Sequence, residues 1–199
     1  MTLRLILASS SGIRAVLLRN AGLNPEIRPA RIDEGAIRSA LESGGAGPRD
    51  VADALAERKA RHTGESDPEA LVLGCDQVLD LDGRVFTKPD DPRAARMQIR
   101  ALSGRTHSLH SAIVVCRGGQ PLWRHVGTAR LTMREVSDTY LDDYIARNWE
   151  SIRHSVGAYK LEEEGVRLFS HIEGDHFTIL GLPLIELLTW LAVRGDIAA

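Results

Sequence analysis

Asp76 is hard to explain as a packing residue, because it interrupts the apolar run VLGCDQVL at residues 72–79. A carboxylate that is buried without a partner costs several kcal/mol or takes up a proton. Two explanations are open. Lys88, on the segment that follows, could form an ordinary buried ion pair with Asp76. Alternatively, Asp76 could bind a divalent cation or activate a water molecule beside a phosphate group.

A second polar cluster follows the first apolar run, in the stretch LASSSGIR at residues 7–14. This stretch is predicted to pass from a strand through a serine-rich loop into a helix. The N–H groups at the helix start, the hydroxyl of Ser9 and the guanidinium of Arg14 suit the binding of phosphate oxygens. The glycine motifs GxxxxGKS/T and GxGxxG are both absent. An ordinary N-cap by one of the serines is the alternative.

Lysine is rare enough in this chain to be informative. Only Lys59, Lys88 and Lys160 are lysines among the 25 Lys and Arg residues. Arginine is a wide, flat fork, whereas lysine is a compact charge on a thin stem that reaches in beside a phosphate or carboxylate. Each lysine is therefore either a functional cation or a solvated surface residue. Arg28 and Arg31 have no assigned role and are expected to be surface charges.

Composition and charge disfavour several classes of protein. A length of 199 residues with 43% apolar content suits one domain with its own core. No apolar run approaches the roughly 20 residues that span a bilayer, and no signal peptide is recognisable. We therefore expect a cytoplasmic protein with no membrane partner. The net charge of -2 and the scarcity of aromatic residues disfavour nucleic acid as a partner. Cys75 and Cys116 lie in apolar segments and are expected to be core residues.

Strand and helix patterns alternate in the elements that must position these residues. We expect strands at 3–8 and 166–172, helices at 13–21, 48–62, 92–102 and 137–148, and a last helix from 183. Hairpins are expected at 70–89 and at 108–136. Residues 23–47 are predicted to be irregular, and 177–181 could form a further strand. This alternation predicts an α/β fold with a mixed β-sheet and flanking helices.

The first hairpin should bring Asp76 and Lys88 close together in either of two registers. A two-residue loop at Asp82 and Gly83 makes Gln77 face Lys88. A three-residue loop that ends with Gly83 in the left-handed conformation places Asp76 opposite Lys88 instead. The sequence leaves this choice open.

Eight short motifs, in order and spacing, resemble the Maf-like nucleotide pyrophosphatase family over nearly the whole chain. They are LASSSGIR (7–14), Ile32-Asp33-Glu34, LAERKA (55–60), GCDQV (74–78), FTKP (86–89), LSGRTH (102–107), VGAY (156–159) with Glu162, and TILGLPL (178–184). The resemblance implies one domain over residues 1–199, with an elongated, two-lobed fold and a central cleft like that of inosine triphosphatases.

The resemblance also implies a reaction and its partners. The expected activity is cleavage of a nucleoside triphosphate between its α- and β-phosphates, which removes unwanted nucleotides from the cellular pool. A divalent metal cation, either Mg²⁺, Mn²⁺ or Co²⁺, is the implied cofactor. A homodimer is the implied assembly.

Individual residues take roles from the same resemblance. The substrate-binding positions are Ser9, Arg14, Lys59 and Lys88. Asp76 corresponds to the catalytic acid and Glu34 to an acidic loop residue, and Lys88 is also placed among the catalytic positions. Asp76 and Glu34 are expected to hold the metal and to position and deprotonate the attacking water. Which of the two carboxylates is the base stays open.

Four positions bear on the substrate. Gln77 and Glu162 are similar to the family branch that acts on 7-methyl-GTP. A carboxylate is favourable there because guanine presents N–H donors, whereas thymine or uracil presents oxygens. Ile13 stands where the family commonly has Arg or Trp, and Glu163, where glycine is usual, could alter the loop or repel phosphates. The alternatives are a dTTP or UTP pyrophosphatase and a nucleotide-binding cell-division regulator with little turnover.

Overall fold

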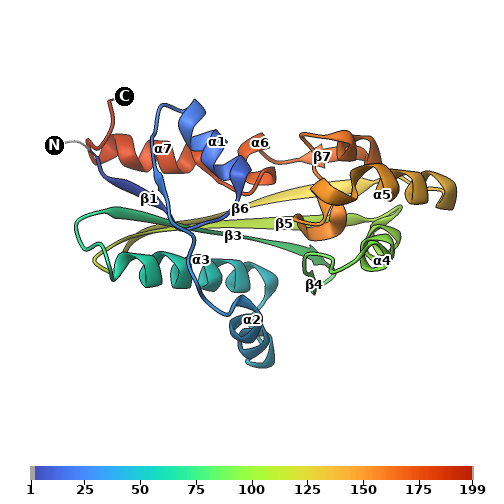
Figure 1. Cartoon of the computed structure of the whole chain (residues 1–199), viewed down its shortest axis with the longest axis horizontal. Coiled ribbons are helices and arrows are strands. Elements are labelled where there is room, and N and C mark those ends of the chain that lie inside the picture. The colour runs from blue at the N-terminus through green and yellow to red at the C-terminus, as the bar shows by residue number, and fades with distance from the viewer. Residues whose placement is uncertain (1–2, 199) are drawn as a thin grey trace.

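The centre of the fold is a seven-stranded mixed sheet with helices on both faces (Figure 1). The computed structural model describes residues 3–198. The strands follow the order β2-β1-β3-β5-β6-β7, and β4 pairs with β3 beside this path. They are β1 (Leu5–Leu7), β2 (Glu26–Ile27), β3 (Leu71–Leu81), β4 (Arg84–Phe86), β5 (Thr106–Arg117), β6 (Gln120–Met133) and β7 (Phe169–Glu173).

Helices cover the sheet on both sides. They are α1 (Gly12–Asn20), α2 (Glu34–Ser43), α3 (Pro48–Gly64), α4 (Pro92–Leu102), α5 (Asp138–Ile152), α6 (His176–Ile179) and α7 (Leu184–Val193), with short 3-10 turns at Val156–Ala158 and Glu164–Leu168. Figure 1 shows α1, α6 and α7 on one face and α2 and α3 on the other. The α/β fold with a mixed sheet, expected from the alternation of patterns, is therefore confirmed.

The hydrophobic core lies on both faces of the sheet, and successive residues of β3 contribute alternately to each face. Leu71 and Leu73 pack with α1 and α7 on one face of the sheet. Val72 and Val78 pack with α3 on the other face. A third cluster joins the far end of the sheet to α4 and α5. Successive strand residues point to opposite faces, so the long apolar run of β3 is what a strand buried on both sides requires.

Three predictions about individual segments were wrong. Residues 23–47 contain helix α2, because the side chain of Asp33 accepts a hydrogen bond from Ala36 N at 2.9 Å and caps it. The expected strand at 177–181 is mostly helix α6, since the side chain of Asp175 accepts a hydrogen bond from Thr178 N at 2.9 Å and caps the helix. Helix α5 continues past Asn148 to Ile152, whose side chain is buried.

The hairpin of β3 and β4 has a two-residue turn. Leu81 pairs with Arg84, and Asp82 and Gly83 both have positive φ, at 53° and 84°, as a tight hairpin turn requires. This is the register in which Gln77 would face Lys88. However, β4 ends at Phe86, so the strands separate before that pair forms.

The middle of β3 has an open edge. On the side where β1 pairs with 71–73 and β4 pairs with 79–81, residues 74–78 have no strand partner within residues 3–198. The carbonyl of Cys75 accepts a hydrogen bond from the Arg14 guanidinium there, at 3.0 Å. Asp76 points to the α3 face and Gln77 to the α6 face, as their hydrogen bonds to Lys59 and Ile179 show. The open edge therefore gives access to both faces of the sheet.

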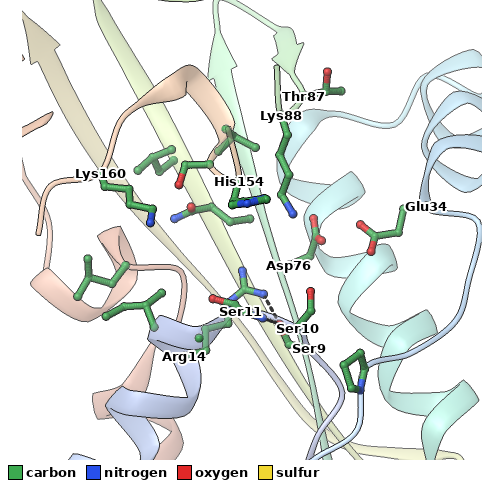
Figure 2. Close-up of a pocket in the computed structure, with 18 of the residues that line it drawn as sticks. Ser9, Ser10, Ser11, Arg14, Glu34, Asp76, Thr87, Lys88, His154 and Lys160 are labelled. Carbon is green, nitrogen blue, oxygen red and sulfur yellow. Dashed lines mark hydrogen bonds between the residues drawn. The ribbon is translucent and has the colours of Figure 1, made fainter. Parts of the chain in front are cut away.

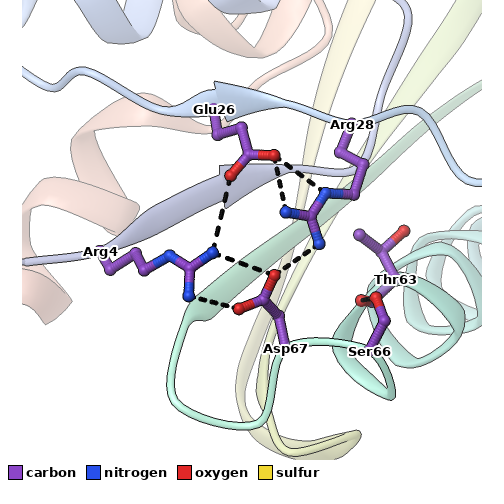
Figure 3. A network of polar contacts seen from close by, with 6 residues as sticks. All are labelled: Arg4, Glu26, Arg28, Thr63, Ser66 and Asp67. Atoms are coloured by element: carbon purple, nitrogen blue, oxygen red, sulfur yellow. Dashed lines mark hydrogen bonds and ion pairs between the residues drawn. The ribbon is translucent and has the colours of Figure 1, made fainter.

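A polar network fastens the edge strand β2 to the loop before β3 (Figure 3). Asp67 forms ion pairs with Arg4 NH1 at 2.5 Å and with Arg28 NH1 at 2.6 Å. Arg28 also forms an ion pair with Glu26 at 2.6 Å. The hydrogen bond from Arg28, together with the charge of Arg4, lowers the pKa of Asp67 despite the loss of water around it. Arg28 is thus a partly exposed surface charge, as expected, and it also joins β2 to Asp67.

Two expectations from composition can be compared with the structure. Cys75 and Cys116 are both buried and free, and burial raises the pKa of each thiol to about 11. Their prediction as core residues is confirmed. Among residues 3–198, no helix combines the length and the apolar character needed to cross a membrane.

Candidate active site

A cavity of about 830 Å³ lies at the open edge of β3. The nine residues that were expected to bind substrate or metal, to act in catalysis or to set specificity all line it, namely Ser9, Ile13, Arg14, Glu34, Lys59, Asp76, Gln77, Lys88 and Glu162. They come from segments that are far apart in the chain, and Figure 2 shows several of them converging on one space. The tertiary structure therefore places these nine residues around a single cavity, whereas Glu163, the fourth position that bears on the substrate, does not line it.

Asp76 is the buried carboxylate at the centre of this cavity. Its side chain is on β3, only 5% of the residue is exposed, and Oδ1 accepts a hydrogen bond from Lys59 Nζ at 2.6 Å. Oδ2 is buried and has no hydrogen-bond partner among the described residues. Loss of water raises the pKa of Asp76, although the charge of Lys59 opposes this shift. An atom of this kind is poised to bind a cation or to accept a proton.

Lys59 bridges two carboxylates. It lies in the last third of α3, and its Nζ also contacts Glu34 Oε1 at 3.0 Å. Glu34 is the first residue of α2, and 43% of its side chain is exposed. The sequence left open an ion pair between Asp76 and Lys88, and this explanation was wrong. The partner of Asp76 is Lys59. Lys59 also keeps the two acids close despite their like charges.

The two carboxylates suit a divalent cation that arrives with phosphate oxygens. Within residues 3–198, no group of three or more His, Cys, Asp or Glu side chains could hold a metal by itself. Mg²⁺ commonly uses only one or two carboxylates and completes its shell with waters and substrate phosphates. The unpartnered Oδ2 of Asp76 and the accessible carboxylate of Glu34 fit that requirement.

Arg14 and Ser9 form the wall next to Asp76. Arg14 is 8% exposed and donates from Nε to Gly181 O at 2.7 Å and from NH1 to Ser9 Oγ at 3.1 Å. The N-cap alternative for the serines was wrong, because Ser11 at the N-cap of α1 makes no side-chain cap. Ser9 Oγ instead accepts hydrogen bonds from Arg14 and from Ser11 N, so its own proton is available to a ligand.

Lys88 is an exposed cation at the rim of the cavity. It lies just beyond the end of β4, and Figure 2 shows its ammonium group pointing toward Asp76. Within the described chain, Lys88 makes no ion pair of 4.0 Å or less, whereas Lys59 makes two. Lys88 is therefore free to bind an anion that enters the cavity.

The loop at 160–164 forms the opposite wall. Lys160 Nζ donates to Ser151 Oγ at 2.7 Å and to Glu163 Oε1 at 3.1 Å. Glu164 accepts hydrogen bonds from Arg147 and from Asn148, each at 2.8 Å, which lowers its pKa to about 2. Glu163 and Glu164 are thus used to fasten the loop to α5, and neither lines the cavity. Glu162 does line it and is exposed.

Arg38 is a cavity residue that the sequence did not indicate. It follows Glu34 by one helical turn on α2, and its Nε is buried without a partner among residues 3–198. The Asp33 cap together with the apolar spacing of Ile37 and Leu41, which pack on the α3 side of the core, could have predicted this helix. His154 also lines the cavity and was not singled out.

Comparisons with known proteins agree with the motifs. The family described as Maf-like protein matches residues 4–193 of the chain. The chain belongs to the Maf-like family. A nucleoside triphosphate pyrophosphatase of Roseobacter denitrificans is 60% identical over 193 residues, which is 97% of both chains. Its counterpart in Ruegeria pomeroyi is 58% identical over 99% of both chains. A 7-methyl-GTP pyrophosphatase of Rhizobium meliloti is 52% identical over 98% of both chains.

Proposed function

We propose that this Maf-like chain hydrolyses the bond between the α- and β-phosphates of a nucleoside triphosphate, releasing the monophosphate and pyrophosphate. The arrangement at Asp76 carries this proposal. One oxygen of a buried carboxylate contacts Lys59 and the other has no partner among the described residues, within a cavity that is also lined by several cationic side chains. Relatives at 60% and 58% identity that are described as nucleoside triphosphate pyrophosphatases support the same reaction.

The cations of the cavity bind the triphosphate. Lys88, just beyond β4, and Arg38, on α2, line the cavity, and Arg14 contributes a fixed positive charge in the wall. Ser9 donates its free proton to a phosphate oxygen. This set supplies several positive charges to one cavity, as three linked phosphates require.

Asp76 orients and accepts a proton from the attacking water. The water oxygen forms a bond to the α-phosphorus while the bond from that phosphorus to the bridging oxygen breaks. Pyrophosphate leaves with the bridging oxygen, and Lys88 and Lys59 stabilise the charge that develops on it. The raised pKa of Asp76 makes it a better proton acceptor than an exposed carboxylate. A divalent cation bound by Asp76 and Glu34 would polarise the water and the phosphate oxygens.

Among nucleoside triphosphates, we propose 7-methyl-GTP as the preferred substrate. Glu162 presents an exposed carboxylate to the cavity, where it would accept hydrogen bonds from the N–H donors of a guanine edge. The 52% identical relative described as a 7-methyl-GTP pyrophosphatase supports this choice. Ile13 offers an apolar contact to the base without aromatic or guanidinium stacking. Preference for dTTP or UTP is the alternative outcome.

The test is incubation with 7-methyl-GTP, GTP, CTP, UTP and dTTP in the presence of Mg²⁺, Mn²⁺ or Co²⁺, with pyrophosphate and orthophosphate measured separately. We expect pyrophosphate, and the highest kcat/KM for 7-methyl-GTP. Asp76→Asn should abolish turnover, whereas Asp80→Asn, on the same strand but outside the cavity, should retain it. Release of orthophosphate alone would contradict the cleavage site. Tight binding of a nucleotide without turnover would favour the alternative function, a nucleotide-binding cell-division regulator.

A further inference from the structure

The side-chain amide of Gln77 is held by several groups on the α6 face of the sheet. Its nitrogen lies 2.9 Å from Ile179 O, 2.9 Å from Ser111 Oγ and 3.4 Å from Thr178 O. Ser111 lies directly opposite Gln77 on β5 and is fully buried. Two of the three contacts are thus backbone carbonyls at the end of α6, and the third is a hydroxyl that solvent does not reach.

The chemistry of these partners decides which way the amide points. Carbonyl oxygens only accept hydrogen bonds, so the group that faces Ile179 and Thr178 must be the NH₂ of Gln77. The Ser111 hydroxyl donates its proton to Thr178 O at 2.7 Å, so its oxygen is left to accept from Gln77. Both hydrogens of the amide are therefore used within the protein. Its oxygen has no hydrogen-bond partner in the described chain, and Gln77 lines the cavity.

Helix α6 can hold Gln77 because a glycine lets it approach the sheet. Gly127 on β6 is the register partner of Ser111, and a Cβ at Gly127 would lie 2.5 Å from Thr178 Oγ1. Any side chain at that position would push α6 away. Asp175 then fixes the helix start by accepting from Thr178 N at 2.9 Å.

We propose that Ser111, with the carbonyls of α6, is a positioning residue that fixes the Gln77 amide so that only its oxygen meets the nucleotide base. This inference rests on the proposed function, because it assumes that the base lies on the Gln77 side of β3 while the phosphates lie on the Asp76 side. The cavity then presents acceptors to the base from Gln77 and Glu162. A guanine-type base, with its N1–H and 2-amino donors, matches them, whereas the carbonyl oxygens of uracil or thymine are repelled.

The first test measures the orientation of the Gln77 amide and does not depend on enzyme activity. In ¹⁵N-labelled protein, the side-chain NH₂ of Gln77 is assigned by its disappearance in Gln77→Leu, and its exchange with solvent is measured. We expect slow exchange in the wild type and much faster exchange in Ser111→Ala. Ser108→Ala, the same change on the same strand but outside the cavity, should leave the exchange unchanged. Fast exchange in the wild type would overturn the proposal.

The second test compares binding of α,β-methylene GTP and α,β-methylene UTP, in which the scissile oxygen is replaced by carbon, using calorimetry. In Ser111→Ala we expect affinity for the guanine analogue to fall about tenfold, the effect of one lost hydrogen bond. Affinity for the uracil analogue should change less than about twofold. Equal weakening of both would show a merely structural role and overturn the proposal. If neither analogue binds, the proposed function fails, and the exchange of the Gln77 NH₂ alone decides the orientation.

Discussion

Gly74 and Ala56 lie closer together than any side chain at position 74 would permit, since a Cβ built there would be 2.0 Å from Ala56 O. The same Cβ would be 2.6 Å from Ala60 N. Helix α3 therefore rests directly on the backbone of β3 at this point. Lys59 precedes Ala60 and Asp76 follows Gly74 by two residues, so this contact sets the 2.6 Å distance between the two charged groups.

Gly74→Ala should both destabilise the fold and impair the site. The added methyl group meets backbone atoms that cannot move aside, so we expect the free energy of unfolding to fall by about 1–3 kcal/mol. Activity should fall as Lys59 is displaced from Asp76. Urea unfolding and steady-state kinetics measure the two effects. Gly35→Ala is the control, because its Cβ would meet only Asp33 Oδ1 at 3.5 Å, an ordinary contact. Similar losses in the two variants would show that the close approach is unimportant.

Asp76→Asn should lose activity without losing stability. Burial raises the pKa of Asp76 above its unfolded value, so its ionisation disfavours folding as pH rises above the unfolded pKa. The neutral amide removes that cost, and we expect the melting temperature at pH 7 to be unchanged or a few degrees higher. The turnover number should fall by at least about a hundredfold.

The melting curves of Asp76→Asn are compared with wild type in EDTA, because a bound cation would favour the carboxylate. Asp80→Asn, on the same strand, is the matched variant for both measurements. A large loss of stability in Asp76→Asn alone would show that the pair with Lys59 outweighs the cost of burial.

Arg38→Ala should weaken substrate binding more than it slows turnover. The guanidinium lines the cavity and makes no hydrogen bond or ion pair in the described chain, so its remaining N–H groups can contact a phosphate. We expect KM to rise about fivefold to tenfold, as for loss of a charge-assisted hydrogen bond, with a smaller change in kcat. Arg31→Ala removes an exposed charge of the same kind outside the cavity and should leave KM unchanged. Unchanged KM in Arg38→Ala would remove Arg38 from the binding site.

His107 should make the fold sensitive to mild acid. It is 2% exposed, its Nε2 lies 2.7 Å from the hydroxyl of Tyr159, and burial lowers its pKa from 6.5 to about 4. The unfolded chain therefore binds a proton at this residue between those values while the folded chain does not. Stability should fall as pH decreases through this window, by up to about 3 kcal/mol from this residue.

The acid sensitivity is measured by urea unfolding of wild type and His107→Gln at pH 7 and pH 4.5. The stability of wild type relative to the variant should decrease at the lower pH. His62→Gln, which changes an exposed histidine on α3, should show no such trend. A constant difference between wild type and His107→Gln would contradict the prediction.

The sequence by itself determined the types of chemical group in the site and most of the elements that carry them. Apolar runs, helix caps and glycine turns predicted both hairpins and the positions of α1, α3, α4 and α7, because these signals act within a few residues of each other. The motifs identified a carboxylate, two lysines and a serine-arginine loop that all reach one cavity. Helix α2 was missed although its Asp33 cap and the spacing of Ile37 and Leu41 indicate it, whereas α6 was missed because the Asp175 cap decides it against a strand-like pattern.

Only the tertiary structure decided which of these groups contact one another. Lys59 is the partner of Asp76 because Gly74 lets α3 lie on β3, and Lys88 stays free because β4 ends at Phe86. Local sequence contains no information on such long-range contacts, since they depend on how separate elements pack. The open edge of β3 could not be predicted from the sequence either. It arises because β1 and β4 cover different parts of one strand, and it allows Asp76 and Gln77 to face one cavity from opposite sides of the sheet.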